Sequence, residues 1–324
     1  GSFTLATYHP HTVGTWTVTG TKGLIIGTTG LTVTPGAISA SQSTLTWNNP
    51  GVITTDGGTA TFTVTAKDQY GNIIPNATVI LASTGTNNSY DPLIVLTNSL
   101  GQAIVRLQST KSETKTISVT IGGVLITQTV SVPFTSGAAH TGVIVADTIT
   151  PEASLAGTTV NLTITVTDVG GNLVADNTPV ALQTNFGVIG GSGNTINGIV
   201  HRTLTVINKG AATLTFSGPS ATGNTIINFV DTTKPIIATQ GDEIREATSH
   251  SGAVVTYDNS TATDNIDGPV SITCLPTSGS TFALGDTTVT CTASDSVPNT
   301  QTSTFVVHVV DTTKTTIDSH ADIS

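Results

Sequence analysis

The feature that most constrains the fold of this chain is an alternation of threonine with apolar residues at a period of two. Residues 60–66 read ATFTVTA, residues 160–166 read VNLTITV, and residues 305–309 read FVVHV. Successive side chains of a β-strand point to opposite faces, so each run would bury one face and expose the other. Gly, Asn and Pro separate these short runs, and no run has helical spacing. The sequence therefore predicts an all-β protein made of β-sandwiches.

The low content of charged residues narrows the class of protein further. Only 9% of the 324 residues are charged, with a net charge of −10, whereas soluble domains carry about 25% charged residues. Disordered chains combine high charge with few β-branched residues, so we expect this chain to be ordered. The ten Lys and Arg residues form no basic stripe, and no apolar run approaches the length of a membrane-spanning helix. We therefore expect neither nucleic-acid binding nor direct insertion into a membrane.

Two segments one hundred residues apart, 62–83 and 162–183, repeat a strand–turn–strand pattern around Asp-x-x-Gly-Asn. Three pairs share the Asp-to-Asn spacing: Asp68 and Asn72, Asp168 and Asn172, and Asp295 and Asn299. An Asp at a strand end can accept backbone N–H groups across a turn, while Gly and Asn tolerate positive φ. We interpret the pattern as a structural turn; a ligand contact is the alternative.

These repeats divide the chain into five parts. We expect a partial sandwich at 1–35, sandwiches at 36–133, 134–230 and 231–311, and the first strand of a further module at 312–324. The linkers PGAIS, PFTSGAAH and DTTKP are short and contain proline, which favours a stiff, elongated rod. The tetrapeptide DTTK stands at both the start and the end of the fourth part.

Two groups of motifs carry a resemblance to known families. Residues 36–133 and 134–230 resemble bacterial immunoglobulin-like domains of the invasin and intimin kind, through the Asp-x-x-Gly-Asn turn and the strand that follows it. Residues 231–311 resemble a HYR (hyalin repeat) domain, through DTTKPII, TCLPTSGSTF, GDTTVTC and FVVHVVDTT. They depart from that pattern at Val297-Pro298-Asn299, where Gly-Asn is usual. The resemblance implies tandem immunoglobulin-like sandwiches of a bacterial or archaeal cell-surface, surface-layer or adhesin protein, and no catalysis.

Cys274 and Cys291 are the only cysteines, and both lie in alternating runs. A cross-strand disulfide between them is geometrically reasonable, and closing a loop of about fifteen residues would contribute roughly 3 kcal/mol. Two cysteines are too few for a zinc site of their own. A disulfide would place the chain in an oxidising, extracellular compartment.

The one cofactor that the sequence suggests is calcium. Calcium takes six to eight oxygen ligands, many of them carboxylates. Four acidic residues are the predicted ligands: Asp258, Asp264 and Asp267 in YDNSTATDNIDG, and Asp295 at a strand end. Asp231, Asp242 and Glu243 near a linker are a second group of the same chemistry. The alternative is that these side chains cap turns and stay solvated.

Four Asn-x-Ser/Thr sequences are candidates for N-glycosylation. They begin at Asn76, Asn87, Asn161 and Asn259. A chain rich in Asn and Thr also produces such sequences by chance, so modification and coincidence both stay open.

No catalytic motif is present: the sequence lacks G-x-S-x-G, a P-loop and H-E-x-x-H. We therefore expect a structural protein of the cell surface, not an enzyme, whose modules build a surface layer, filament or stalk. The alternatives are an adhesin that binds a receptor or glycan through a sandwich tip, and spacer modules of a larger secreted enzyme. Trp16 and Trp47 lie in alternating runs, where core burial is more common, so no aromatic glycan-binding platform is expected.

Two interpretations of the layout stay open. The chain is either a window on a longer array or a polymer subunit whose incomplete sandwich accepts a strand from a neighbour. In the second case the open edges are residues 24–34 and 315–324, and the partner is a second copy or a neighbouring module.

Overall fold

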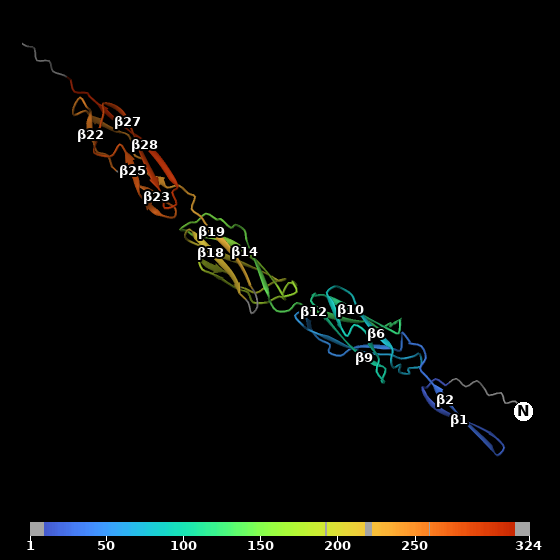
Figure 1. The fold of residues 1–324 in the computed structure, drawn as a ribbon. Coiled ribbons are helices and arrows are strands. Elements are labelled where there is room, and N and C mark those ends of the chain that lie inside the picture. Colours follow the sequence, from blue (N-terminus) through green and yellow to red (C-terminus); the bar gives the residue numbers. More distant parts are fainter. Residues whose placement is uncertain (1–9, 192, 218–221, 259, 315–324) are drawn as a thin grey trace, which may run out of the picture.

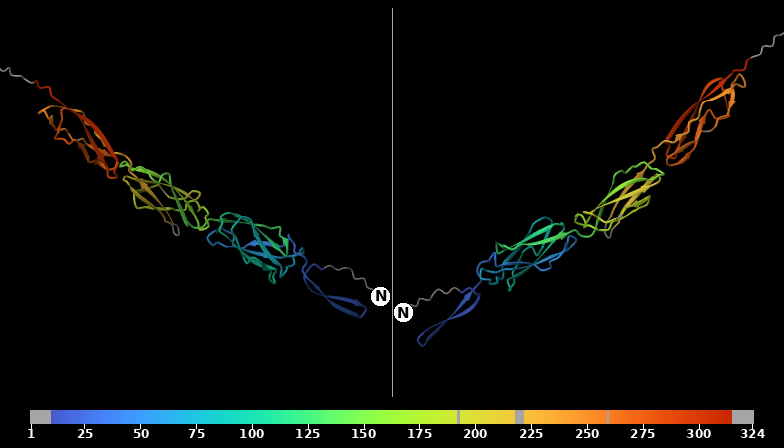
Figure 2. Two further views of the ribbon diagram at one scale, coloured as in Figure 1. Left: turned by 45° about the horizontal axis from the view of Figure 1, so that its top comes forward. Right: turned by 180° about the vertical axis from the view of Figure 1, so that it is seen from behind.

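The computed structural model describes residues 10–191, 193–217, 222–258 and 260–314. These ranges form β-strands and contain no helix, so none of them holds a helix that could cross a membrane. A hairpin and three β-sandwich modules follow one another along one line, with the hairpin at one end (Figure 1). Two further views show the same order (Figure 2). The molecule is an elongated all-β rod: the alternation predicted its strands, and the short linkers predicted its elongated shape.

The hairpin consists of β1 (Gly14–Lys22) and β2 (Ile25–Val33), which pair antiparallel and with no other described strand. Its tight turn uses Gly23 at φ +60°, and nearly all of its side chains are exposed. The predicted burial of Trp16 is wrong, because no second sheet covers the described hairpin and 44% of this residue is exposed. Residues 1–9 of the predicted partial sandwich and residues 315–324 of the predicted last strand lie outside the described residues.

The first module contains two sheets that face each other. One sheet has the order β3 (Thr44–Trp47), β5 (Ala60–Thr65), β9 (Gln102–Ser109), β7 (Asn88–Asp91). The other has the order β4 (Ile53–Thr54), β12 (Val130–Thr135), β10 (Thr114–Ile121), β6 (Thr78–Ser83), β8 (Val95–Leu96), with β11 (Val124–Leu125) beside β10. The last strand, β12, pairs parallel with β4.

The second module is one continuous ladder of seven strands folded around a core. Its order is β15 (Ala181–Thr184), β18 (Gly210–Ser217), β19 (Thr222–Phe229), β13 (Thr141–Ala146), β14 (Thr158–Thr167), β17 (Ile199–Val206), β16 (Val188–Gly190). Gly142 of β13 packs on the ring of Phe216, where a Cβ would come within 2.4 Å of that ring. Only glycine fits at this position without displacing the aromatic side chain.

The third module is the smallest. Its main sheet has the order β21 (Glu243–Glu246), β28 (Thr300–Val310), β27 (Gly285–Ser294), β25 (Ile272–Leu275). A three-stranded sheet, β20 (Ile236–Ile237), β23 (Ala262–Asp264), β24 (Gly268–Val270), lies at the end nearest the second module, and β22 (Ala253–Val255) pairs with β26 (Ser280–Phe282) at the far end (Figure 1).

The alternation of the sequence builds a separate hydrophobic core in each module. In β5 every second residue is buried, including Phe62 and Val64, and β14 buries Leu162 and Ile164 in the same way. Trp47 is half-buried and packs against the core of the first module. The core of the third module is smaller and aromatic, with the rings of Tyr257 and Phe305 packed edge to face at 5.0 Å. Because each module has its own core, the stiffness of the rod depends on the contacts between modules.

Candidate functional site at the module junctions

The Asp carboxylate makes the same backbone hydrogen bonds in all three copies of the Asp-x-x-x-Asn turn. The Asp carboxylate accepts the N–H groups of the residues two and four positions later, each at 2.9 Å. Gly71 and Gly171 hold the fourth position at φ +85° and +77°. The third copy has Pro298 there and keeps the same carboxylate bonds, so the departure from the usual pattern does not change this hydrogen bonding. The interpretation as a structural turn is confirmed.

The copy in the second module also binds the first module. Asp168 Oδ2 accepts the hydroxyl of Thr55 at 2.5 Å and the N–H of Gly137 at 2.9 Å. Asn172 accepts the N–H of Ser112 at 2.9 Å and donates to the carbonyl of Thr110 at 2.8 Å. Both side chains of the turn are buried. One turn therefore holds a loop, a linker and a strand connection of the preceding module.

Gly170 makes this close contact possible. A Cβ at Gly170 would lie 2.4 Å from the backbone oxygen of Thr110 in the first module. The equivalent position in the first copy is Tyr70, so the turn itself accepts a large side chain. The glycine is required by the neighbouring module, not by the backbone of the turn.

The copy in the first module binds the segments that lead into that module. Asn72 donates to the carbonyl of His11 at 2.7 Å, and Asp68 accepts the N–H of Gly36 at 3.0 Å. The ring of His11 stacks on Tyr70 with centroids 4.0 Å apart. The Asp68–Asn72 turn thus holds the segment before the hairpin, as the equivalent Asp168–Asn172 turn holds the first module.

The copy in the third module binds the linker through one contact, from Asn299 to the carbonyl of Asp231 at 3.1 Å. Other side chains complete this junction. Ile266, in the turn between β23 and β24, joins the hydrophobic core cluster of the second module. An apolar side chain of the third module is therefore buried against the second.

A glutamate clamps each copy of the Asp-Thr-Thr segment. Glu152 accepts the N–H and the hydroxyl of Thr232 at 2.9 and 2.7 Å, and also the hydroxyl of Thr233. Glu246 accepts the same groups of Thr312 at 2.7 and 2.9 Å. This clamp explains why the tripeptide recurs, and sequence reasoning missed it because each glutamate lies far from its threonines along the chain.

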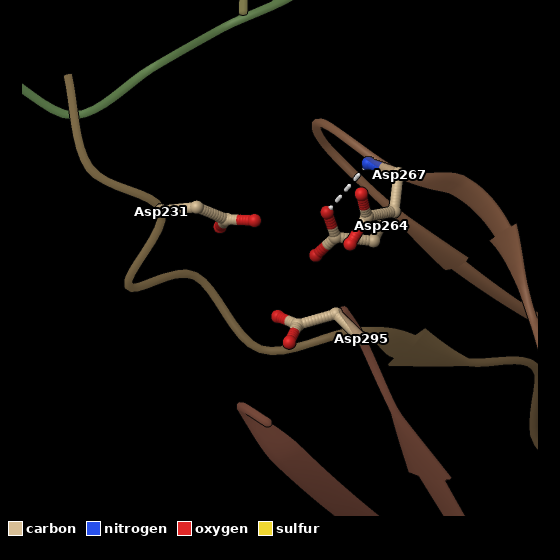
Figure 3. Close-up of side chains that lie close together, drawn as sticks. All are labelled: Asp231, Asp264, Asp267 and Asp295. Carbon is tan, nitrogen blue, oxygen red and sulfur yellow. Dashed lines mark hydrogen bonds between the residues drawn. The ribbon is translucent and has the colours of Figure 1, made fainter. Parts of the chain in front are cut away.

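Four aspartates meet at the junction of the second and third modules, and we call them the junction acids: Asp231, Asp264, Asp267 and Asp295. One oxygen from each lies within 4.8 Å of the others. The side chains of Asp231 and Asp264 point toward each other across the space between linker and third module (Figure 3). Asp264 accepts the N–H of Ile266 at 2.8 Å and that of Asp267 at 3.0 Å, which fixes its carboxylate.

Lys209 of the second module reaches into the junction acids from the turn between β17 and β18. Its ammonium lies 2.9 Å from Asp267, 3.2 Å from Asp231 and 2.6 Å from the hydroxyl of Ser296. The hydrogen bond from Lys209 holds the pKa of Asp267 down to about 2. Burial raises the pKa of Asp231, and the charges of Asp264 and Asp295 raise it further although Lys209 opposes them.

The predicted calcium ligands are therefore brought together only in part. Asp264, Asp267 and Asp295 meet, but Asp258 does not belong to the group and is exposed. Asp258 follows β22, which lies at the far end of the module, whereas Asp264 ends β23 at the junction (Figure 1). Asp231, and not Asp258, is the fourth member of the acidic group. The second predicted group was Asp231, Asp242 and Glu243, and only Asp231 belongs to the junction acids. Asp242 instead accepts the N–H of Val306, and Glu243 pairs with Arg245.

The remaining predicted sites lie outside the junctions. Cys274 and Cys291 are direct partners in β25 and β27 and form a disulfide. Asn76 and Asn87 are exposed in turns at φ +59° and +58°, and the amide of Asn161 donates to Asp147 at 2.8 Å. Asn259 lies outside the described residues.

Comparison with protein families agrees with this architecture. Residues 42–135 match the model of the bacterial Ig-like domain (group 1), and residues 230–309 match that of the HYR domain. The chain thus contains a bacterial Ig-like domain and a HYR domain. Neither domain is named for an enzymatic activity.

This Ig-like and HYR chain is similar in sequence to hyalin and in structure to invasin and the adhesin FdeC. It is 26% identical over 325 residues to hyalin of Lytechinus variegatus, a match that covers 88% of this chain and 60% of hyalin. The structure of invasin, titled a bacterial integrin-binding protein, aligns with a TM-score of 0.50 at 19% identity, over 92% of this chain and 65% of invasin. The adhesin FdeC of Escherichia coli aligns with a TM-score of 0.44 at 20% identity, over 68% and 75% of the two chains. The likeness to invasin shows the fold.

Proposed function

We propose that these modules form a stiff stalk in an extracellular, cell-surface structural protein, where they set the distance between the cell and its surroundings. The observation that carries the proposal is the contact of Asp168 and Asn172 with the preceding module. Three hydrogen bonds from this turn to two loops of the first module, and a fourth to the linker at Gly137, oppose bending at that joint. The tandem arrangement of the modules along one line supports the same role (Figure 1).

The test is small-angle scattering of the full chain and of Gly170→Tyr. The wild-type profile should fit a rod with fixed joints. The tyrosine has no room beside Thr110, so the variant should show a shorter maximum dimension and a broader distribution of distances. Tyr70 occupies this position in the first copy, which indicates that the turn will fold.

Asp91→Asn, an exposed change on β7 of the first module, is the matched control and should leave the profile unchanged. A wild-type profile typical of freely jointed modules would reject the stalk. Identical profiles for wild type and Gly170→Tyr would show that the turn does not hold the joint.

Self-assembly by strand addition is a second candidate, and the hairpin favours it. Within the described ranges β1 and β2 pair only with each other, and Leu24, Ile25 and Ile26 at the tip are strongly exposed. Unpaired strand edges of this kind accept strands from other chains. Sedimentation of the wild type and of Leu24→Asp, Ile26→Asp across concentrations tests it; a wild type that stays monomeric at high concentration excludes it.

A further inference from the structure

We propose that the junction acids form a calcium-binding site between the second and third modules, in which Lys209 is a built-in competing cation. The proposal concerns this joint alone and does not depend on the stalk function. The first observation is an excess of negative charge at the joint. Four carboxylates gather within 4.8 Å, and Lys209 is the cation that the described residues place among them. One ammonium cannot compensate four carboxylates.

A second observation is the environment of Asp231. Its side chain is 0% exposed, and its Oδ1 atom has no hydrogen-bond partner in the described structure. The carboxylate is directed toward Asp264 (Figure 3). A buried carboxylate oxygen is unfavourable unless a donor or a cation lies beside it. Asp231 comes from the linker, independently of the three acids of the third module, and its unpaired oxygen is available to a cation.

The donor set selects the kind of cation. All four residues offer carboxylate oxygens, and no His or Cys belongs to the group. Oxygen-only sites favour hard cations over zinc or copper. One oxygen from each carboxylate would supply four of the six to eight oxygen ligands that calcium takes, and water would complete the set. Magnesium requires a compact octahedron and retains its waters, so it should bind here more weakly.

Lys209 would compete with calcium for two of the junction acids, Asp231 and Asp267. The lysine belongs to the second module, while three of the acids belong to the third module and Asp231 to the linker. In the structure the ammonium joins the second module to the linker through Asp231 and to the third module through Asp267. A calcium ion bound to those two carboxylates would displace the ammonium and tie the linker directly to the third module.

Isothermal titration of the full chain with calcium chloride, after treatment with a chelator, tests the proposal. We expect one calcium ion per chain, and weaker heat with magnesium chloride. Asp231→Asn should weaken calcium binding about tenfold because it removes a charged ligand, and Lys209→Met should strengthen it about tenfold because it removes the competing charge. Asp258→Asn, which changes an exposed acid outside the group, is the matched control and should bind as the wild type does.

Circular dichroism reports whether each variant folds, and the wild-type titration stands by itself if one does not. No calcium heat and no calcium-dependent rise in melting temperature for the wild type and Lys209→Met would overturn the site. Equal affinity for calcium and magnesium would show a diffuse negative patch instead. Calcium binding by Lys209→Met no tighter than by the wild type would overturn the role of Lys209.

Discussion

The two joints between sandwich modules use the same turn with different partners. Between the first and second modules, the Asp168 carboxylate is surrounded by neutral O–H and N–H donors, and Gly170 lets the neighbouring backbone approach. Between the second and third modules, the turn makes one contact to the linker, and Lys209 with the junction acids supplies the rest of the polar contact. The repeated turn therefore lies at each joint between modules. The residues that contact it determine whether the joint is sensitive to pH or to salt.

The largest effect that separates the joints is expected from removal of the turn aspartate. Asp168→Ala leaves the hydroxyl of Thr55 and the N–H of Gly137 without their acceptor, in addition to the bonds within the turn. We expect a loss of about 3 kcal/mol, since hydrogen bonds to charged groups are strong and unpaired buried donors are costly. Asp295→Ala breaks only contacts within its own module and should cost less.

Chemical denaturation, followed by hydrogen exchange so that each module is resolved, measures the two losses. Asp91→Asn again serves as the control. An equal loss for Asp168→Ala and Asp295→Ala would show that the contacts between modules add nothing to the turn itself.

The second-largest effect is expected from lowering the pH, which should weaken the joint at Asp168. Burial opposes its ionisation, but the hydrogen bonds from Thr55, Asn172 and Gly137 outweigh burial and hold its pKa below the ordinary 3.8. Since the pKa is lower in the folded state, the stabilisation is complete above the ordinary value and is lost as the pH falls toward the folded value. The difference in unfolding free energy between wild type and Asp168→Asn should therefore shrink from pH 7 to pH 3. A constant difference would contradict this assignment of the pKa.

Salt should produce the smallest effect, and only at the charged joint. Raising sodium chloride from 0.1 to 1 M shortens the screening length from about 10 to about 3 Å. Because Lys209 is partly exposed, its coupling to Asp267 is expected to be about 1 kcal/mol or less and to fall with salt. A double-mutant cycle of Lys209→Met and Asp267→Asn in chelated buffer measures it. Coupling that is unchanged in 1 M salt would argue against an ion pair at this joint.

The strands and turns follow from local sequence. The alternation in β5 and β14 places the same side chains inward as the structure does, and the carboxylate of Asp68 or Asp168 bonds to residues two and four positions away. These interactions depend on neighbours along the chain. The same reasoning failed for Trp16, because alternation defines an apolar face without saying whether another sheet will cover it.

The sequence by itself determined an all-β chain with repeated sandwich segments, three similar turns and a cysteine pair in two alternating runs. Only the tertiary structure decided that Thr55 meets Asp168, 113 residues away, and that Asp231 replaces Asp258 beside Asp264. Strand periodicity arises from backbone geometry over a few residues, so it can be read locally. The partners of a joint depend on how folded modules dock against one another, and a local pattern contains no record of that.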